Sequence, residues 1–177
     1  MNIFILDNDP ETAAQMYCDK HVPKMVVEVY QMMGSALRRH GATDSQMPLT
    51  SKGTPLIGGY KHHPVTLWVG DSQTNFVWSA LHAIELCREY TKRYGKTHAC
   101  EAGIRQMADM LDMITTGPQT PYAQAMPDEY RSEDAVEAYR DYYWLDKRRF
   151  AKWDKGTPAP DWWVEAEIEE CAAELMV

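Results

Sequence analysis

The stretch DKHVPKMVVE, residues 19–28, begins the segment around which we expect the fold to be organised. Within it, His21, Lys24 and Glu28 are spaced i, i+3 and i+7, which places them on one ridge of a helix. Gln31 continues this ridge. The apolar stripe beside it consists of Met25, Val26, Val29, Met32, Met33 and Leu37. The pattern therefore predicts an amphipathic helix whose polar ridge borders the core.

This helix is expected to begin well before the quoted stretch. Asp9 followed by Pro10 is a strong start signal, because Asp caps the free amides and Pro fits the first helical position. A helix should therefore run from Pro10 to about Arg39. Pro23 removes one hydrogen bond inside it and clashes with a preceding carbonyl, so we expect a kink at that point.

The rest of the chain shows helical periodicity and no competing strand signal. Helical patterns occupy residues 72–94, 97–114, 132–156 and 161–177, whereas residues 40–63 and 115–131 are expected to be irregular. The last helix is expected to dock through Trp162, Ile168, Cys171, Ala172 and Leu175. The sequence thus predicts one all-α domain, residues 1–177, with about five helices and a buried N-terminal segment at residues 2–6.

Length and charge limit the classes of function. A chain of 177 residues can bury one sizeable core, and its net charge of −8 argues against a broad nucleic-acid surface. The charge is unevenly distributed, because residues 161–177 hold six acids and no base while Lys and Arg outnumber Asp in residues 140–155. A modest anionic ligand is therefore compatible with the sequence.

The sequence also bears on location. No run of 18 apolar residues occurs, and MNIFILDNDP lacks the features of a signal peptide, so we expect a soluble, cytoplasmic protein without membrane contact. The four cysteines form no CxxC pair and are expected to be buried thiols.

The ridge of His21, Lys24 and Glu28 is the first candidate catalytic site. A Glu at the border between core and solvent can act as a general base or stabilise a cation, and Lys or His beside it can donate a proton. The alternative is an ordinary amphipathic helix that carries an exposed Lys24–Glu28 ion pair.

A second ridge lies on the helix expected at residues 72–94. It consists of His82, Glu85 and Glu89, and Arg93 follows one turn later. A surface ion pair between Glu89 and Arg93 is one interpretation. The other is an anion site at the glycine that ends the helix, formed by Arg93, Lys96 and His98.

The loop end KHHP, residues 61–64, places two histidines just before Trp68. Histidine pairs suggest a metal, but no Glu is followed by His three residues later, and no HExxH or zinc spacing occurs. We therefore expect neither a metal nor a cofactor.

The segment AYRDYYWLDKRRFAKW, residues 138–153, interleaves aromatic and basic side chains, which together can stack a base and hold its phosphate. Alternatively the aromatic side chains are core, and Tyr139, Tyr143 and Phe150 keep the helical spacing for this role. Over the whole chain, the residues expected to bind substrate are His63, Trp68, Asn75, Glu89, Arg93, Lys96, His98, Tyr139, Arg140, Tyr143 and Lys147.

Several of these stretches resemble a family of small, largely uncharacterised bacteriophage-type proteins. They are CDKHVPKM, KHHPVTLW, EYTKRYGKTH, AMPDEY and AYRDYYWLDK. More distantly, the chain is similar to the pyrimidine-dimer DNA glycosylases of the endonuclease V type. That similarity rests on the short N-terminal segment, on Asp19, His21 and Glu28, and on the later helix IELCREYTKR.

The distant resemblance implies a compact all-α enzyme that cuts the glycosidic bond of a damaged base. In such enzymes the N-terminal α-amine attacks the sugar and forms an imine, and a helix glutamate takes part in catalysis. Glu28 would be that glutamate, with His21 beside it. Asn2 departs from the pattern, because it is bulkier than the residues before which an initiator Met is routinely removed.

Three hypotheses follow from these observations. The first is an N-glycosidic-bond-cleaving enzyme that acts on DNA or on a nucleotide. The second is a phage protein without catalysis that binds or sequesters a phosphate-bearing nucleotide. The third is a helical interaction protein whose polar ridges are only solvated.

Overall fold

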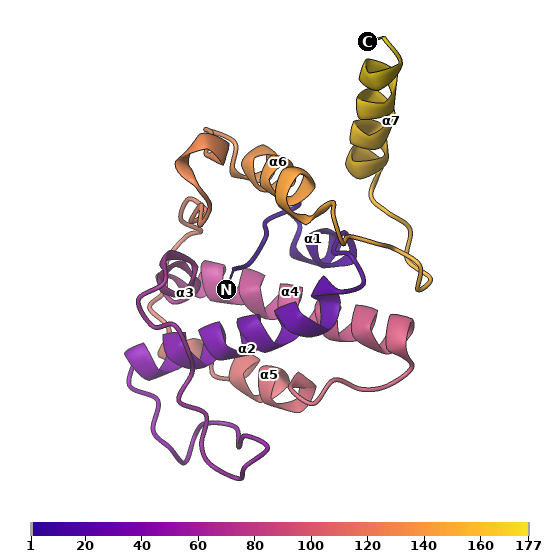
Figure 1. Ribbon diagram of the computed structural model, residues 1–177. Coiled ribbons are helices and arrows are strands. Elements are labelled where there is room, and N and C mark those ends of the chain that lie inside the picture. The colour runs from indigo at the N-terminus through magenta and orange to yellow at the C-terminus, as the bar shows by residue number, and fades with distance from the viewer. Residues whose placement is uncertain (1, 177) are drawn as a thin grey trace.

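The computed structural model describes residues 2–176, and within that range the protein is all-α, as predicted (Figure 1). The seven α-helices are α1 (Pro10–Gln15), α2 (His21–Arg39), α3 (Pro64–Val69), α4 (Gln73–Tyr94), α5 (Glu101–Ala108), α6 (Ala135–Lys147) and α7 (Asp161–Leu175). Two short 3₁₀ helices, η1 (Leu111–Met113) and η2 (Asp128–Tyr130), lie in the connections. The described residues contain no strand, only one isolated bridge between Leu49 and Pro55.

The two long helices, α2 and α4, form the centre of the fold, with α1 and α5 packed against them (Figure 1). The core between them is lined by the predicted apolar stripe of α2 together with Phe76, Ala83 and Leu86 of α4. The N-terminal residues Ile3, Phe4, Ile5 and Leu6 are buried as well, which confirms that prediction.

An extended buried segment needs partners for its backbone groups, and Tyr17 supplies them. Its hydroxyl accepts a hydrogen bond from the Phe4 N–H at 2.8 Å and donates one to the Phe4 carbonyl at 2.9 Å. Burial raises the pKa of Tyr17, so the hydroxyl keeps the proton that it donates. The N-terminal segment is therefore fixed on the helices without being part of a sheet.

The single kinked helix expected from Pro10 to Arg39 is wrong. The chain breaks at residues 16–20, so that α1 ends at Gln15 and α2 begins at His21. Pro23 consequently lies in the first turn of α2, where its missing N–H has no partner to lose and no kink results.

The helix expected at residues 72–94 is confirmed. Ser72 caps its start, because its Oγ accepts a hydrogen bond from the Asn75 N–H at 3.2 Å, and Gly95 ends it with a left-handed φ of 69°. The helix expected at residues 97–114 is shorter and covers Glu101–Ala108, followed by η1. Residues 40–63 are irregular, as expected.

The C-terminal part differs most from the predictions. The helix expected at residues 132–156 covers only Ala135–Lys147, because Asp134 rather than Ser132 caps it and the chain turns at Arg148. Helix α7 does not dock through Ile168, Cys171 and Leu175, which are exposed, and it extends away from the other helices (Figure 1).

Helix α7 is anchored at its beginning, and further along by an ion pair between Glu170 and Arg148. Trp163 is buried, and its ring contacts the rings of Trp144, Trp153 and Trp162. Of the cysteines, Cys18 and Cys87 are buried as expected, whereas Cys171 is exposed. No helix among the described residues combines the length and apolar character needed to cross a bilayer.

Candidate functional site

Glu28 lies in the middle of α2, and each oxygen of its carboxylate faces a nitrogen. Its Oε2 accepts a hydrogen bond from the backbone N–H of Asn2 at 2.8 Å, and its Oε1 lies 3.2 Å from Nζ of Lys24. The Glu28 side chain is 12% exposed, whereas that of Lys24 is 63% exposed. The carboxylate is therefore nearly buried but open to solvent on the Lys24 side.

The backbone of Asn2 is held in place through its own side chain. Asn2 Nδ2 donates to the Ala125 carbonyl at 2.8 Å, and the Tyr139 hydroxyl lies 3.1 Å from Asn2 Oδ1. The same hydroxyl accepts a hydrogen bond from the Ala125 N–H. The irregular segment before α6 thus fixes the N-terminal segment against Glu28, and Tyr139 is a buried positioning residue rather than a base-stacking surface.

His63 also lies near Glu28. Burial lowers the pKa of His63, and the negative charge of Glu28 opposes this shift, so the two side chains are within electrostatic reach. His63 is the residue before α3, and its Nδ1 accepts a hydrogen bond from the Val65 N–H at 3.3 Å. The end of the long irregular segment is therefore within electrostatic reach of the carboxylate.

His21 is the first residue of α2, seven residues before Glu28, and it is buried. Its ring stacks on Phe4 with 5.4 Å between ring centroids, and its Nδ1 is 2.8 Å from the hydroxyl of Tyr143. Tyr143 is itself fully buried, which favours the core interpretation of this aromatic residue. Burial, together with nearby lysine ammonium groups, lowers the pKa of His21 to about 3. His21 is therefore neutral near neutral pH.

The neutral state of His21 makes stability depend on pH. In the unfolded chain the histidine pKa is near 6.5, so below that value the unfolded state binds more protons than the folded state. This contribution to stability is complete above about pH 6.5 and is lost as the pH falls toward 3. Between about pH 7 and about pH 5 we expect a loss of about 2 kcal/mol that His21→Asn does not show.

Urea unfolding of the wild type and of His21→Asn at both pH values measures this difference. The variant is the control, because every other titrating group is common to the two proteins. Equal pH dependence in both proteins would show that His21 is not held neutral by the fold.

Three lysines lie within electrostatic reach of His21, and one of them, Lys24, pairs with Glu28. Each of them, Lys147, Lys24 and Lys20, lowers the pKa of His21. Lys20 Nζ lies 4.7 Å from the ring centroid of Phe150, and Lys147 Nζ lies 5.5 Å from that of Phe4. Lys147 also pairs with the neighbouring Asp146. Lys20, Lys24 and Lys147 are called the lysine patch below.

Lys20 was not among the predicted site residues. The sequence did offer an indication of its role, because Lys20 directly precedes His21 in the stretch DKHVPKMVVE. The break between α1 and α2, which the periodicity did not reveal, places Lys20 directly before α2, where it lies within electrostatic reach of His21, as Lys147 does.

Arg93 and Glu89 are not at this site. The Arg93 side chain is 0% exposed, and its donors are taken by Glu89 at 2.7 Å, Asp19 at 3.1 Å and the carbonyls of Tyr17 and Gln15. The guanidinium therefore has no donor directed at a ligand. The predicted anion site at the end of α4 does not form, because its central cation points into the protein.

The other two members of that predicted site lie apart from Arg93. Lys96 is exposed, whereas the His98 ring is half-buried and its Nε2 lies 3.2 Å from the carbonyl of Pro23 at the start of α2. Burial lowers the pKa of His98, so this ring donates its N–H to the carbonyl in the neutral state.

Trp68 and Asn75 hold the fold together rather than line an open site. Trp68 is buried, and its indole N–H donates to the Thr120 carbonyl at 3.2 Å. Asn75 is fully buried, and its amide bonds both the Trp68 carbonyl and Thr120. Both residues fix the segment that follows α5 against α3 and α4.

Arg140 lies in a separate hollow of about 660 Å³ between α1, α4 and the start of α7. Its Nε donates to the Leu6 carbonyl at 2.8 Å, and its guanidinium lies 5.7 Å from the Trp162 ring. Glu89 lines the same hollow. The structure thus brings Arg140 and Glu89 together, but not at Glu28.

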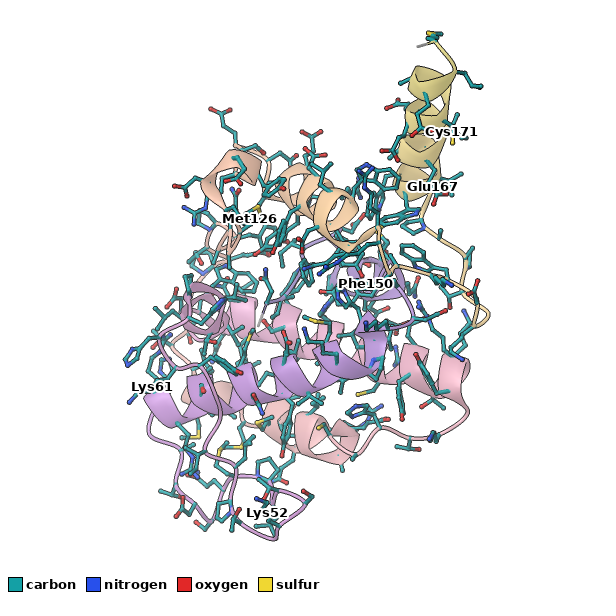
Figure 2. The ribbon with its side chains drawn as sticks, in the orientation of Figure 1. Lys52, Lys61, Met126, Phe150, Glu167 and Cys171 are labelled. Carbon is teal, nitrogen blue, oxygen red and sulfur yellow. The ribbon has the colours of Figure 1, made fainter. Side chains whose placement is uncertain are left out.

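Three residues labelled in Figure 2 can be placed relative to α2. Phe150, beside Lys20, lies near the start of α2, and Lys61 lies near its other end. Lys52 lies at the far tip of the irregular segment. Among residues 2–176, no three His, Cys, Asp or Glu side chains are grouped so that they could hold a metal ion.

One comparison with known proteins gave a match. The sequence model of the family described as pyrimidine dimer DNA glycosylase matches residues 1–102, which include Asn2, Lys24, Glu28 and His63. No curated protein and no solved structure matches the chain.

Proposed function

The chain belongs to the pyrimidine dimer DNA glycosylase family, and on this premise we propose that it cleaves the glycosidic bond of a damaged pyrimidine in DNA with Glu28 as the catalytic carboxylate. The observation that carries the proposal is the pair of nitrogens on Glu28, those of Asn2 and Lys24. A carboxylate between two nitrogens can accept a proton from an attacking amine and stabilise a cationic sugar.

The covalent step requires a free amine at this carboxylate. The amine lone pair forms a bond to C1′ of the sugar, and the C1′–N bond breaks with its electron pair leaving on the base. Loss of amine protons, with opening of the sugar ring, then gives an imine. The nitrogen of Asn2 is such an amine where Asn2 is the first residue of the mature chain, and Lys24 Nζ is a second amine on the same carboxylate.

The test of the proposal is an incubation of the protein with duplex DNA that contains a pyrimidine dimer, with and without borohydride. We expect one glycosidic bond of the dimer to be cut, and with borohydride a stable secondary amine that links protein to DNA. Because the cut pyrimidine stays joined to its neighbour within the dimer, base release is measured after the dimer has been split by photoreversal. Peptide mapping of the adduct identifies the amine. Neither base release nor adduct, from protein whose N-terminus has been checked by mass spectrometry, would refute the proposal.

The lysine patch supports DNA as the substrate, although the chain is acidic overall. Phosphate binding depends on local cations, and Lys20, Lys24 and Lys147 all lie within electrostatic reach of His21, at the start of the helix that carries Glu28. The acidic α7 projects away from the other helices, so much of the negative charge is distant from this surface (Figure 1).

The patch leads to a prediction about salt. Lys20→Gln should weaken binding to duplex DNA and make the slope of log K against log salt less negative by about 0.9 for one lost phosphate contact. Fluorescence anisotropy over a salt series measures this slope. The matched control is Lys52→Gln, at the far tip of the irregular segment (Figure 2). Equal slopes for both variants would show that the patch does not contact phosphate.

Sequestration of a nucleotide, the second hypothesis, would use the hollow at Arg140. Trp162 and Arg140 suit a base and a phosphate. The hollow, however, is lined by the three carboxylates of Glu89, Asp161 and Glu165 against the two cations Arg140 and Lys92, so its net charge repels phosphate. The glycosylase proposal is therefore better supported.

A further inference from the structure

Residues 58–63, called the tyrosine turn below, form the last part of the irregular segment and are fixed to α2. The Gly59 N–H donates to the Gln31 carbonyl at 3.3 Å, and Ser35 Oγ donates to the Gly59 carbonyl at 2.8 Å. Gly58 has a φ of +91°, and a Cβ there would lie 2.4 Å from the backbone nitrogen of Ser35. The turn therefore approaches α2 so closely that only glycine fits.

Tyr60 lies in this turn in an unfavourable backbone conformation. Its φ is 55°, a left-handed value that bulky residues rarely adopt, and it is the one non-glycine residue between 2 and 176 with a positive φ. The side chain is 60% exposed. Over the same residues, no hydrogen bond from its hydroxyl and no contact with another ring is found. The fixed turn thus holds an aromatic ring out into solvent.

The position of Tyr60 relates this ring to Glu28. Gln31, which binds the turn, lies three residues after Glu28 and shares its face of α2. The turn closes with a hydrogen bond from the His63 N–H to the Tyr60 carbonyl at 2.9 Å, and the His63 side chain is within electrostatic reach of Glu28. Lys61, exposed at the edge of the molecule, directly follows Tyr60 (Figure 2).

We propose that the Tyr60 ring stacks on a nucleobase of the bound DNA and so holds the neighbouring sugar at Glu28. This inference rests on the proposed function. An exposed aromatic ring on a fixed turn that also carries a lysine is suited to this contact, because every base offers a flat face and the lysine attracts the phosphate. A strained backbone that displays an unpartnered ring has no evident value for folding.

The experiment measures binding apart from chemistry. Wild type, Tyr60→Ala and Tyr60→Phe are titrated with a duplex containing a tetrahydrofuran abasic analogue, which has no base to release. We expect Kd to rise between about 5-fold and about 150-fold for Tyr60→Ala, and to stay within about twofold for Tyr60→Phe, which keeps the ring. The matched control is Ile57→Ala, an exposed apolar residue in the same irregular segment.

Tyr60→Gly separates weaker binding from loss of folding. Glycine adopts the positive φ without strain, so this variant should melt no lower than the wild type. It lacks the ring, so it should bind the duplex as weakly as Tyr60→Ala. The inference is overturned if Tyr60→Ala binds like the wild type, if Ile57→Ala is equally weakened, or if the wild type does not bind the duplex. Base release from dimer-containing DNA tests the proposed function separately. Release without dependence on Tyr60 refutes the stacking role alone, and Tyr60-dependent binding without release refutes the proposed function alone.

Discussion

Replacing Glu28 by Gln is expected to lower the rate of base release by about 10²-fold to about 10⁴-fold while leaving the fold intact. The amide keeps the size of the side chain, and its oxygen can still accept the Asn2 N–H. It cannot take a proton from an attacking amine, and it has no negative charge with which to stabilise a cationic sugar. Single-turnover glycosidic cleavage of dimer-containing duplex, measured as the base freed after photoreversal of the dimer, gives the rate, and thermal melting measures the fold.

The chain offers a matched control for this change. Glu85 on α4 is also nearly buried, and it too has an N–H donor, Gln15 Nε2 at 2.9 Å, and an exposed cation, Arg88 Nη1 at 3.0 Å. Glu85→Gln should leave the rate within a few-fold of the wild type, because Glu85 contacts neither the N-terminal segment nor the lysine patch. If Glu28→Gln and Glu85→Gln release base equally fast, Glu28 is not the catalytic residue.

The part of the site that could be predicted is the part formed within one helix. Lys24 and Glu28 were expected on one ridge from their spacing alone, and the structure places their charged groups 3.2 Å apart. Helical geometry is local, so four residues of separation are sufficient to predict the contact. The all-α class followed from the same periodicity, as did the extent of α4.

Contacts between distant segments could not be predicted in this way. The Asn2 N–H that binds Glu28 comes from a segment with no periodic pattern, and its position depends on Tyr17, Tyr139 and the carbonyl of Ala125. The break at residues 16–20 was also missed, because the apolar pattern continues through it. What stabilises that break is a side chain from another helix, Arg93.

Arg93 shows why a charged residue near a helix end was misinterpreted. The sequence gives its charge and its place before a glycine, which suit an anion site, but it does not give the side of α4 that the rest of the chain covers. In the structure that side is covered by residues 15–19 and 152–157. The exposure of α7 was missed because the sequence does not show whether another segment covers its apolar residues. Within residues 2–176 of the structure, no segment covers Ile168 or Leu175.

Replacing Arg93 by Met is accordingly expected to lower the free energy of unfolding by about 3–5 kcal/mol. The change removes the cation between Asp19 and Glu89, both buried, and leaves the carbonyls of Tyr17 and Gln15 without their donors. Buried charges without a partner are among the most costly defects in a folded protein. Urea unfolding measures the loss.

The matched control is Arg105→Met on α5. Arg105 pairs with Glu101 at the same i, i+4 spacing as Arg93 with Glu89, but the Arg105 side chain is 50% exposed, so the loss should stay below about 1 kcal/mol. Adding Glu89→Gln to Arg93→Met should recover part of the stability, because the change removes one of the unpaired charges. The opposite outcome would be an equal loss of unfolding free energy in Arg93→Met and Arg105→Met, with weaker DNA binding only in Arg93→Met. That outcome would show that Arg93 binds substrate, as the sequence predicted.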